Sequence, residues 1–133
     1  MIVVDTNVIA YLFLPTEHTE SVEKLLAVDP EWAAPILWRS ELRNVLALYM
    51  RKKLLDFDAA YAIQTEAESL LAGQEYELDS YSVLSLAESS GCATYDCEFI
   101  ALAQRLDIPL VTQDKKLLQA FPSIALSIEK ALG

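Results

Sequence analysis

The chain has 133 residues, with 20 acidic residues against 10 Lys and Arg, and its net charge of −10 excludes a surface that binds polyanions over its whole extent. Hydrophobic residues make up 53% of the chain, which predicts either a dense core or an apolar surface that meets a partner. No apolar run reaches the ~18 residues that a membrane span needs. The two cysteines, Cys92 and Cys97, are too few for a disulfide scaffold and lack the spacing of a zinc motif. We therefore expect one domain over residues 1–133, without a signal peptide, in a reducing cytoplasm.

The first half of the chain alternates β-branched runs with helical patterns. The strand-like run Ile2 to Val4 stops at Asp5, and Pro15 and Pro35 interrupt the elements that follow. In chain order we predict a strand from Ile2 to Val4, helices from Thr6 to Leu14 and from Glu17 to Val28, a strand from Trp32 to Ala34, and long helices from Ile36 to Lys53 and from Asp56 to Gly73.

The second half continues the alternation. We predict a strand from Tyr76 to Leu78, helices from Ser80 to Ser90 and from Asp96 to Leu106, a strand from Pro109 to Val111, a helix from Lys115 to Phe121, a strand near Ile124 to Leu126 and a helical tail. Such alternation favours a three-layer α/β/α sandwich with a central, mainly parallel sheet. Ligands bind such sheets outside the carboxyl ends of the strands. Asp5 directly follows the first strand and Asp114 follows Val111 by three residues, so both are expected at that edge.

Glu41 lies on the apolar side of its predicted helix. It follows Trp38 by three residues and precedes Val45 and Leu48 by four and seven, so these residues share one helix face. A carboxylate at the border of a buried stripe needs compensation for its charge. A salt bridge or a metal ion would supply it, and the spacing alone leaves both open.

Three aspartates have a simpler alternative explanation. Asp5 and Asp114 precede predicted helices and Asp96 begins one, so each could act as an N-cap. Asp96 also comes just before the inward-facing residues Phe99 and Ile100. Taken singly, none of these positions is specific.

The four acids are informative together, because all could meet at one edge of the sheet. Carboxylates gathered within a few ångströms repel one another, so they take up protons or bind cations. Hard oxygen ligands select Mg²⁺ or Mn²⁺, and such ions activate water for attack on a phosphate. The single histidine, His18, lies in a polar stretch and is expected at the surface. A histidine general base is therefore not expected.

With these acids in place, the chain resembles the PIN-domain family, and more narrowly the VapC-like toxin ribonucleases of toxin–antitoxin pairs. The resemblance covers nearly the whole chain. It rests on four motifs in order: Ile2 to Asn7, Pro35 through Glu41 to Leu46, Thr94-Tyr95-Asp96 with Phe99 to Ala103, and Leu110 to Asp114 with Leu117 and Phe121 behind it.

The resemblance implies that Asp5, Glu41, Asp96 and Asp114 hold Mg²⁺ or Mn²⁺ and cleave RNA. It implies supporting polar roles for Thr6, Asn7 and Thr112, whose hydroxyl or amide groups could orient carboxylates. It also implies a homodimer and a VapB-like antitoxin that blocks the site. Two readings stay open beside the toxin: an RNA-processing nuclease outside a toxin–antitoxin system, and a catalytically silent binding module. Glu98 is an extra acid that either assists a metal or lines the entrance.

Contacts to the substrate are less defined. Arg39 and Arg43 lie four residues apart on the Glu41 helix, and Lys115 and Lys116 adjoin Asp114. These side chains could bind RNA phosphates or an antitoxin carboxylate, and they could equally be solvated or paired with acids. For the homodimer, the motivation is the apolar composition together with Ile9, Tyr11, Leu12, Phe13 and Leu14 in one short helix.

Two other acid-cluster classes fit less well. A phosphatase of the haloacid dehalogenase type needs a second Asp two residues after the first, and Asn7 stands at that position. A response-regulator-like receiver needs adjacent acids near its start, whereas Asp5 is the only acid between Ile2 and Asn7.

Overall fold

The structure is a computed structural model that describes residues 1–133. Its elements follow one another as β1 (Ile2–Val4), α1 (Thr6–Phe13), α2 (Thr19–Val28), β2 (Trp32–Pro35), α3 (Trp38–Arg51), α4 (Phe57–Leu70), β3 (Glu75–Tyr76), α5 (Ser80–Ser90), α6 (Thr94–Leu106), β4 (Leu110–Val111), α7 (Lys115–Ala120), β5 (Ala125–Leu126) and α8 (Ile128–Leu132).

The five strands form one sheet in the order β3-β2-β1-β4-β5, and every neighbouring pair is parallel. In the central strand, Val3 lies beside Ala33 of β2 and Leu110 of β4. The residues of β1, β2 and β4 are buried, as expected for parallel strands that helices cover on both faces. The predicted α/β fold class with a parallel central sheet is confirmed.

The strand order reverses at the centre of the sheet. From β1 the chain moves outward to β2 and β3, and it then returns to place β4 and β5 on the other side of β1. The backbone N–H of Asp5 donates to the carbonyl of Val111 over 3.0 Å, so the carboxyl ends of β1 and β4 lie level with each other. This switch point is where parallel sheets of this kind bind ligands.

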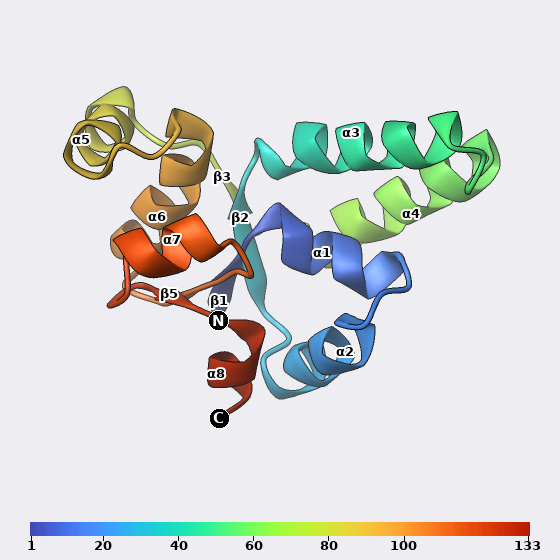
Figure 1. The fold of residues 1–133 in the computed structure, drawn as a ribbon, viewed down its shortest axis with the longest axis horizontal. Helices are drawn as coiled ribbons and strands as arrows, with labels where there is room; N and C mark the ends of the chain where they lie inside the picture. Colours follow the sequence, from blue (N-terminus) through green and yellow to red (C-terminus); the bar gives the residue numbers. More distant parts are fainter.

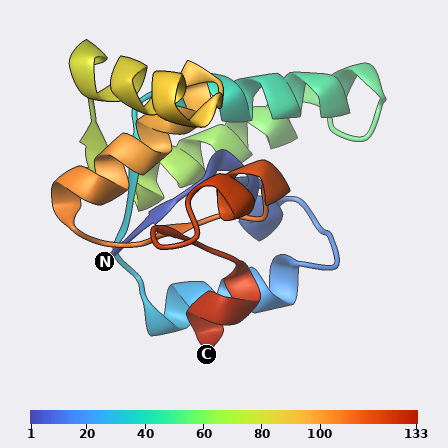
Figure 2. The same ribbon diagram turned by 60° about the vertical axis from the view of Figure 1, so that its left-hand side comes forward.

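Helices flank the sheet on both sides (Figure 1). Helices α5 and α6 lie on one side, where α6 contacts β1, β2 and β4, and α1 to α4 lie on the other. Helices α3 and α4 form an antiparallel hairpin that extends away from the sheet. The last helix, α8, packs against α2 (Figure 2).

Several helix starts differ from the sequence prediction. Helix α3 begins at Trp38 rather than Ile36, because the N–H of Ile36 still bonds to Tyr76 of β3. Helix α2 begins at Thr19, because a turn in which Thr19 Oγ1 accepts from the N–H of Thr16 precedes it. Helix α6 begins at Thr94 with Ala93 as its N-cap, so Asp96 lies inside the first turn and does not cap the helix.

The apolar side chains of α1, which motivated the predicted homodimer, are only partly covered. Ile9 and Leu14 are buried, and Tyr11, Leu12 and Phe13 are half-buried against the core. The large apolar side chains that stay exposed lie mostly on other helices and loops: Met1, Val28, Ile36, Leu48, Leu54, Phe57, Tyr61, Tyr81, Leu84 and Tyr95. None of the helices has the length and apolarity to cross a membrane.

Candidate active site

Asp5 sits at the switch point of the sheet, where β1 ends and α1 begins. Its Oδ1 accepts the N–H of Thr6 over 2.8 Å, so it is the N-cap of α1. Its Oδ2 accepts the hydroxyl of Thr112 over 2.7 Å, which ties it to the chain beyond β4. The residue is only 8% exposed. Asp5 therefore caps a helix, yet the cap uses one of its two oxygens and leaves the other oriented by Thr112.

Glu41 lies in the first turn of α3, opposite the start of α1. Its Oε1 accepts the hydroxyl of Thr6 over 2.7 Å. No cationic side chain forms an ion pair with Glu41. The sequence left a salt bridge and a metal open as compensation for this charge, and the structure contains no such salt bridge.

Asp96 and Asp114 approach from the other side of the sheet. Asp96 lies in the first turn of α6, where the positive end of the helix favours a carboxylate. Asp114 is the N-cap of α7, with Oδ1 accepting from the N–H groups of Lys116 and Leu117. Its own N–H donates to Thr112 Oγ1 over 3.0 Å. Thr112 thus links Asp5 and Asp114 through one hydroxyl.

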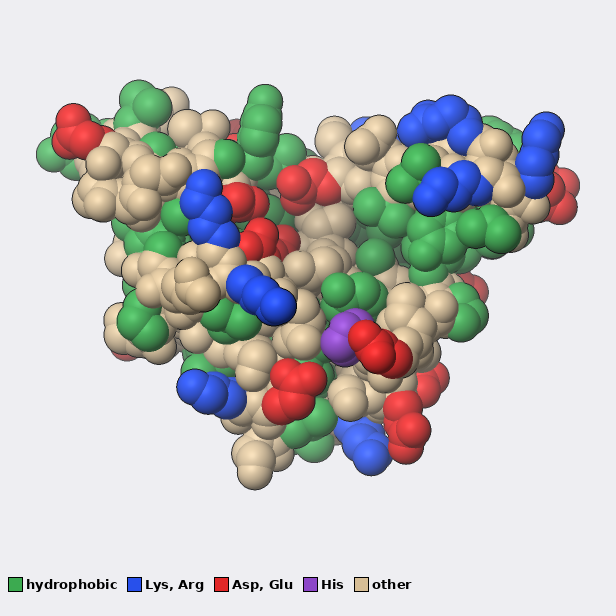
Figure 3. Space-filling view, viewed as in Figure 1, with side chains coloured by type: hydrophobic (Ala, Val, Ile, Leu, Met, Phe, Trp, Pro, Cys, Tyr) green, Lys and Arg blue, Asp and Glu red, His purple; other side chains and the backbone are tan.

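The four acids line one pocket of about 360 Å³, together with Thr6, Asn7, Asn44 and Val45. Acidic side chains are visible in the central hollow between the two halves of the molecule (Figure 3). Each carboxylate stands at the start of a helix: α1, α3, α6 or α7. The partial positive charges of these helix starts partly offset the repulsion among the acids.

The carboxylates remain electrostatically strained. The pKa of Asp5 is raised from 3.8 to about 6, mainly by burial and also by the charges of Glu41 and Asp96, against the hydrogen bonds from Thr112 and Thr6. The pKa of Glu41 is raised by burial and by the charges of Asp96 and Glu98. The pKa of Asp96 is raised by burial and by Asp114. These carboxyl groups hold protons more tightly than exposed ones, because burial and neighbouring negative charge disfavour their ionised forms.

A hard cation suits this pocket. In the arrangement present, no three acids stand close enough to enclose one ion between them. Mg²⁺ is usually held by only one or two carboxylates, with waters and substrate phosphates completing its shell. The side-chain oxygen of Asn7 is buried without a hydrogen-bond partner, which leaves another oxygen donor free in the pocket lining. Oxygen donors of this kind fit Mg²⁺ or Mn²⁺ rather than a softer ion.

Sequence reasoning missed two features of the pocket. Asn44 lines the pocket. Helical spacing could have predicted this, because Asn44 lies three residues after Glu41 on α3 and so shares its face. The hydrogen bond from Thr6 to Glu41 joins residues 35 apart in the chain and had no sequence signal. Glu98 does not line this pocket. It lies beside it and half-buried, close enough for its charge to raise the pKa of Glu41.

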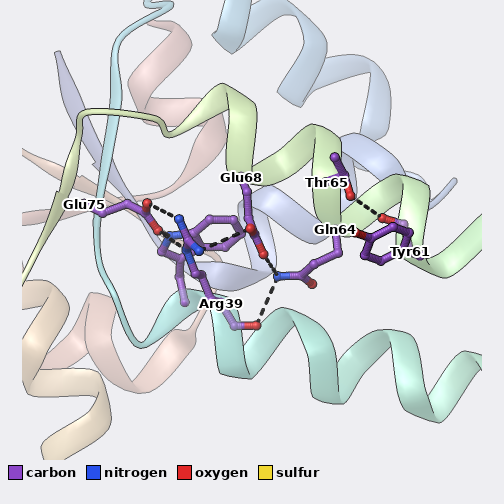
Figure 4. Close-up of polar contacts among 7 residues, drawn as sticks. Arg39, Tyr61, Gln64, Thr65, Glu68 and Glu75 are labelled. Atoms are coloured by element: carbon purple, nitrogen blue, oxygen red, sulfur yellow. Dashed lines mark hydrogen bonds and ion pairs between the residues drawn. The ribbon is translucent and has the colours of Figure 1, made fainter.

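Arg39 does not reach the acidic pocket. Its Nε and one terminal nitrogen donate to the two oxygens of Glu75 in β3, both over 2.6 Å, and its other terminal nitrogen lies 3.2 Å from Glu68 in α4 (Figure 4). The indole of Trp38 also donates to Glu75. These pairs occupy the guanidinium, so the structure gives no support to Arg39 as an RNA contact.

The other basic candidates differ in position. Arg43 is exposed and faces a separate hollow between α3 and α4, away from the four acids. Lys115 and Lys116 are both exposed at the start of α7. Of the two, Lys116 interacts with the acidic pocket, because its charge lowers the pKa of Asp96.

Comparisons with known proteins agree with this arrangement. A profile of the PIN domain matches residues 2–121. Ribonuclease VapC3 of Pyrobaculum aerophilum is 29% identical over 128 residues, which cover 92% of this chain and 96% of the relative.

Solved structures share the fold. The crystal structure of PAE2754 from Pyrobaculum aerophilum superposes with a TM-score of 0.79 at 24% identity, covering 98% of this chain and 85% of that one. FitAcB from Neisseria gonorrhoeae gives 0.72 at 22% identity, covering 97% and 99%. A toxin–antitoxin complex from Klebsiella pneumoniae gives 0.68 at 16% identity, covering 96% and 98%. Because the profile spans most of the chain, the protein belongs to the PIN domain family.

Proposed function

We propose that the protein is a metal-dependent endoribonuclease that hydrolyses RNA phosphodiester bonds. The observation that carries the proposal is one pocket lined by Asp5, Glu41, Asp96 and Asp114, none of which has a basic partner in ion-pair contact. Three of these acids, Asp5, Glu41 and Asp96, have raised pKa values. The name of the Pyrobaculum relative, a ribonuclease, supports RNA as the substrate class.

The four carboxylates would hold Mg²⁺ or Mn²⁺, which when bound activates water and offsets the negative charge of the phosphate. The residues of the chain have separate parts in this scheme. Thr112 and Thr6 hold Asp5 and Glu41 in fixed orientations, because each hydroxyl donates to one carboxylate oxygen. Outer hydrogen bonds of this kind typically change metal affinity by about 10- to 100-fold. Asn7 and Asn44 offer amide groups to the substrate or to water at the pocket wall.

The test is RNA cleavage by the purified protein. A single-stranded RNA should be cut internally with Mg²⁺ or Mn²⁺ and should remain intact with EDTA. Cleavage that survives EDTA would contradict the metal-dependent mechanism. Binding of RNA without cleavage under any metal would favour the alternative of a silent PIN-fold binding module.

We further propose that the nuclease is the toxin of a toxin–antitoxin pair, blocked by a VapB-like protein. The structural likeness to a toxin–antitoxin complex supports this assignment. The alternative is an RNA-processing nuclease with no antitoxin. A short neighbouring gene for a DNA-binding protein, whose product suppresses cleavage by the purified enzyme, would decide for the toxin. The absence of such an inhibitor would favour the processing enzyme.

We also propose a homodimer. Its support is the outward side of α5 and the start of α6, where Tyr81, Leu84 and Tyr95 are exposed large apolar side chains on adjoining helices. Light scattering at micromolar concentration should give twice the chain mass. Tyr81→Ser with Leu84→Ser should give the mass of one chain, and a wild-type monomer would refute the proposal.

A further inference from the structure

The outer end of the α3–α4 hairpin departs from the charge of the rest of the molecule. Between Glu41 and Asp56 the chain has no acidic residue, yet it carries four of the ten basic ones: Arg43, Arg51, Lys52 and Lys53. All four are exposed. In Figure 3, Lys and Arg side chains gather at this end of the hairpin, apart from the acids in the central hollow. A locally basic tip therefore belongs to a protein with a net charge of −10.

These basic side chains have no partner within the protein. None of the four forms an ion pair. The nearest acids in the sequence are Glu41, which lines the acidic pocket, Asp56, whose Oδ1 caps α4, and the exposed Asp58. Favourable interaction with the negative end of α3 explains a base in the last turn, which is Arg51. The same interaction extends to Lys52, the C-cap, and to Lys53 after it, but it does not explain Arg43 two turns before the helix end.

The same tip exposes aromatic rings. Phe57 and Tyr61, one turn apart at the start of α4, are 69% and 65% exposed, and their rings lie nearly parallel with centroids 6.0 Å apart. Phe57 lines two adjoining hollows, one with Arg43 and Met50 and one with Met50 and Lys53. Basic side chains beside exposed aromatic rings are the combination that binds single-stranded nucleic acid, through phosphates and through the faces of the bases.

One rigid helix connects this tip to the acidic pocket. Glu41 and Asn44 line the pocket near the start of α3, and Lys52 follows the same helix 11 residues after Glu41. At the rise of an α-helix, this places the two backbones about 16 Å apart. This distance is short enough for a single strand held in the pocket to reach the tip within a few nucleotides.

We propose that the tip formed by Arg51, Lys52, Lys53, Phe57 and Tyr61 is a second RNA-binding surface that holds single-stranded RNA beyond the cleavage pocket. The proposal rests on RNA being the substrate of the proposed function. RNA is favoured over an acidic protein for two reasons. The tip shares α3 with the proposed cleavage pocket, and the exposed aromatic rings lie beside the basic side chains, where nucleobases could stack on them.

The test measures binding without cleavage. A labelled 12-nucleotide single-stranded RNA is titrated with full-length protein in EDTA across several salt concentrations. Lys52→Gln with Lys53→Gln should weaken binding and lower the slope of log affinity against log salt by about 1.4, since each phosphate contact on a single strand contributes about 0.7. The matched control, Lys24→Gln with Lys130→Gln, makes the same change in net charge at exposed sites elsewhere and should leave the slope unchanged.

The aromatic part is tested by Phe57→Ala and Tyr61→Ala, each of which should weaken binding at least about fivefold. Equal effects of the two lysine pairs would overturn the proposal, as would the absence of any effect at the tip. Competition by polyglutamate as strong as by RNA would also overturn it and would point to an acidic protein partner. Loss of the dimer in the tip variants, with RNA binding unchanged, would identify the tip as a protein interface instead.

The two proposals fail in different ways. Tight binding that depends on the tip, without cleavage in Mg²⁺ or Mn²⁺, would refute the nuclease and leave the surface standing. Cleavage in Mg²⁺ that is unaffected by the tip variants, with unchanged affinity, would refute the surface and leave the nuclease standing.

Discussion

Two groups of carboxylates lie on opposite sides of the first turn of α3, and they behave in opposite ways. Glu75 and Glu68 receive the guanidinium of Arg39, and its hydrogen bond lowers the pKa of Glu75. Glu41, two residues after Arg39, faces Asp5, Asp96 and Asp114 with no cation in ion-pair contact, and its pKa is raised. A paired group joins α3, α4 and β3. An unpaired group stores repulsion that a bound cation would relieve, so it is the candidate for function.

The largest expected effect comes from removing one carboxylate of the unpaired group. Asp5→Asn should lower metal-dependent RNA cleavage by at least about a hundredfold, since even outer partners of metal ligands cost up to that much. Its stability without metal should be unchanged or higher, because Asn still caps α1 and one repelling charge is gone. Asp96→Asn should behave alike. The measurements are cleavage with Mg²⁺ or Mn²⁺ and the melting temperature in EDTA.

Two outcomes would count against this. Cleavage retained in Asp5→Asn would mean that Asp5 only caps α1. A clear fall in the metal-free melting temperature would point the same way. Added Mg²⁺ should raise the melting temperature of the wild type more than that of the variant, because an ion that binds only the folded state stabilises it.

The next effect is a pH dependence of opposite sign in the two groups. Asp5 has a folded pKa of about 6 against 3.8 when exposed, so the folded state binds its proton more tightly. Its contribution to stability is full below about pH 4 and is lost as pH rises to about 6, a loss on the order of 3 kcal/mol. The pKa of Glu75 is lowered, so its contribution is present above its ordinary value of 4.5 and is lost as pH falls below it.

The free energy of unfolding, measured by urea unfolding between pH 3 and pH 7 in EDTA, separates the two pH dependences. We call the loss between pH 4 and pH 6 the first limb of the stability curve. Asp5→Asn should remove most of the loss between pH 4 and pH 6, with a remainder from Glu41 and Asp96, and Glu75→Gln should reduce the loss on acidification. Mg²⁺ should also flatten the first limb, because it binds the deprotonated carboxylates. A first limb that persists undiminished in Asp5→Asn would show that another group produces it.

The third largest effect is expected from removing the cation of the paired group, Arg39. Arg39→Ala leaves Glu75 and Glu68 without their cation, and Glu75 is only 13% exposed. A fully buried pair would cost about 3–5 kcal/mol when broken, but solvent reaches Arg39, whose side chain is 32% exposed. We therefore expect a loss of about 2 kcal/mol in the free energy of unfolding.

Arg43→Ala is the matched control, one turn further along the same helix and without an ion pair. It should change stability by less than about 0.5 kcal/mol. Equal losses in the two variants would mean that the Arg39 pairs contribute nothing beyond helix packing.

The smallest effect is expected from an outer hydrogen bond. Thr6→Val keeps the shape of the side chain and removes the hydroxyl that donates to Glu41. The affinity for Mg²⁺, measured by calorimetry, should fall about tenfold, while the fold is retained. Thr65→Val, which removes a hydroxyl bonded to the carbonyl of Tyr61 on the exposed side of α4, should leave the affinity unchanged. An unchanged affinity in Thr6→Val would show that Glu41 needs no fixed orientation.

Much of the pocket was accessible to sequence reasoning, since Asp5 and Asp114 follow strands that parallel pairing brings to one edge. Glu41 was accessible through its apolar helix neighbours. Asp96 was accessible through the inward-facing residues that follow it. The alternative role as an N-cap does not apply, because α6 begins two residues earlier. The pairing of Arg39 with Glu75 could not be predicted, because Glu75 is 36 residues away in the chain and no local pattern indicates the contact.

The order of strands and helices and the placement of acids after β1 and β4 were determined by the sequence itself, because alternating hydrophobic periods and turn residues act over a few neighbours. The tertiary structure alone decided which carboxylates are paired. Thr112 meets Asp5 across 107 residues, and Arg39 meets Glu75 rather than the pocket. Electrostatic interactions and hydrogen bonds act through space. Whether an acid is paired within the fold or is left able to bind a cation therefore depends on which distant side chains pack beside it.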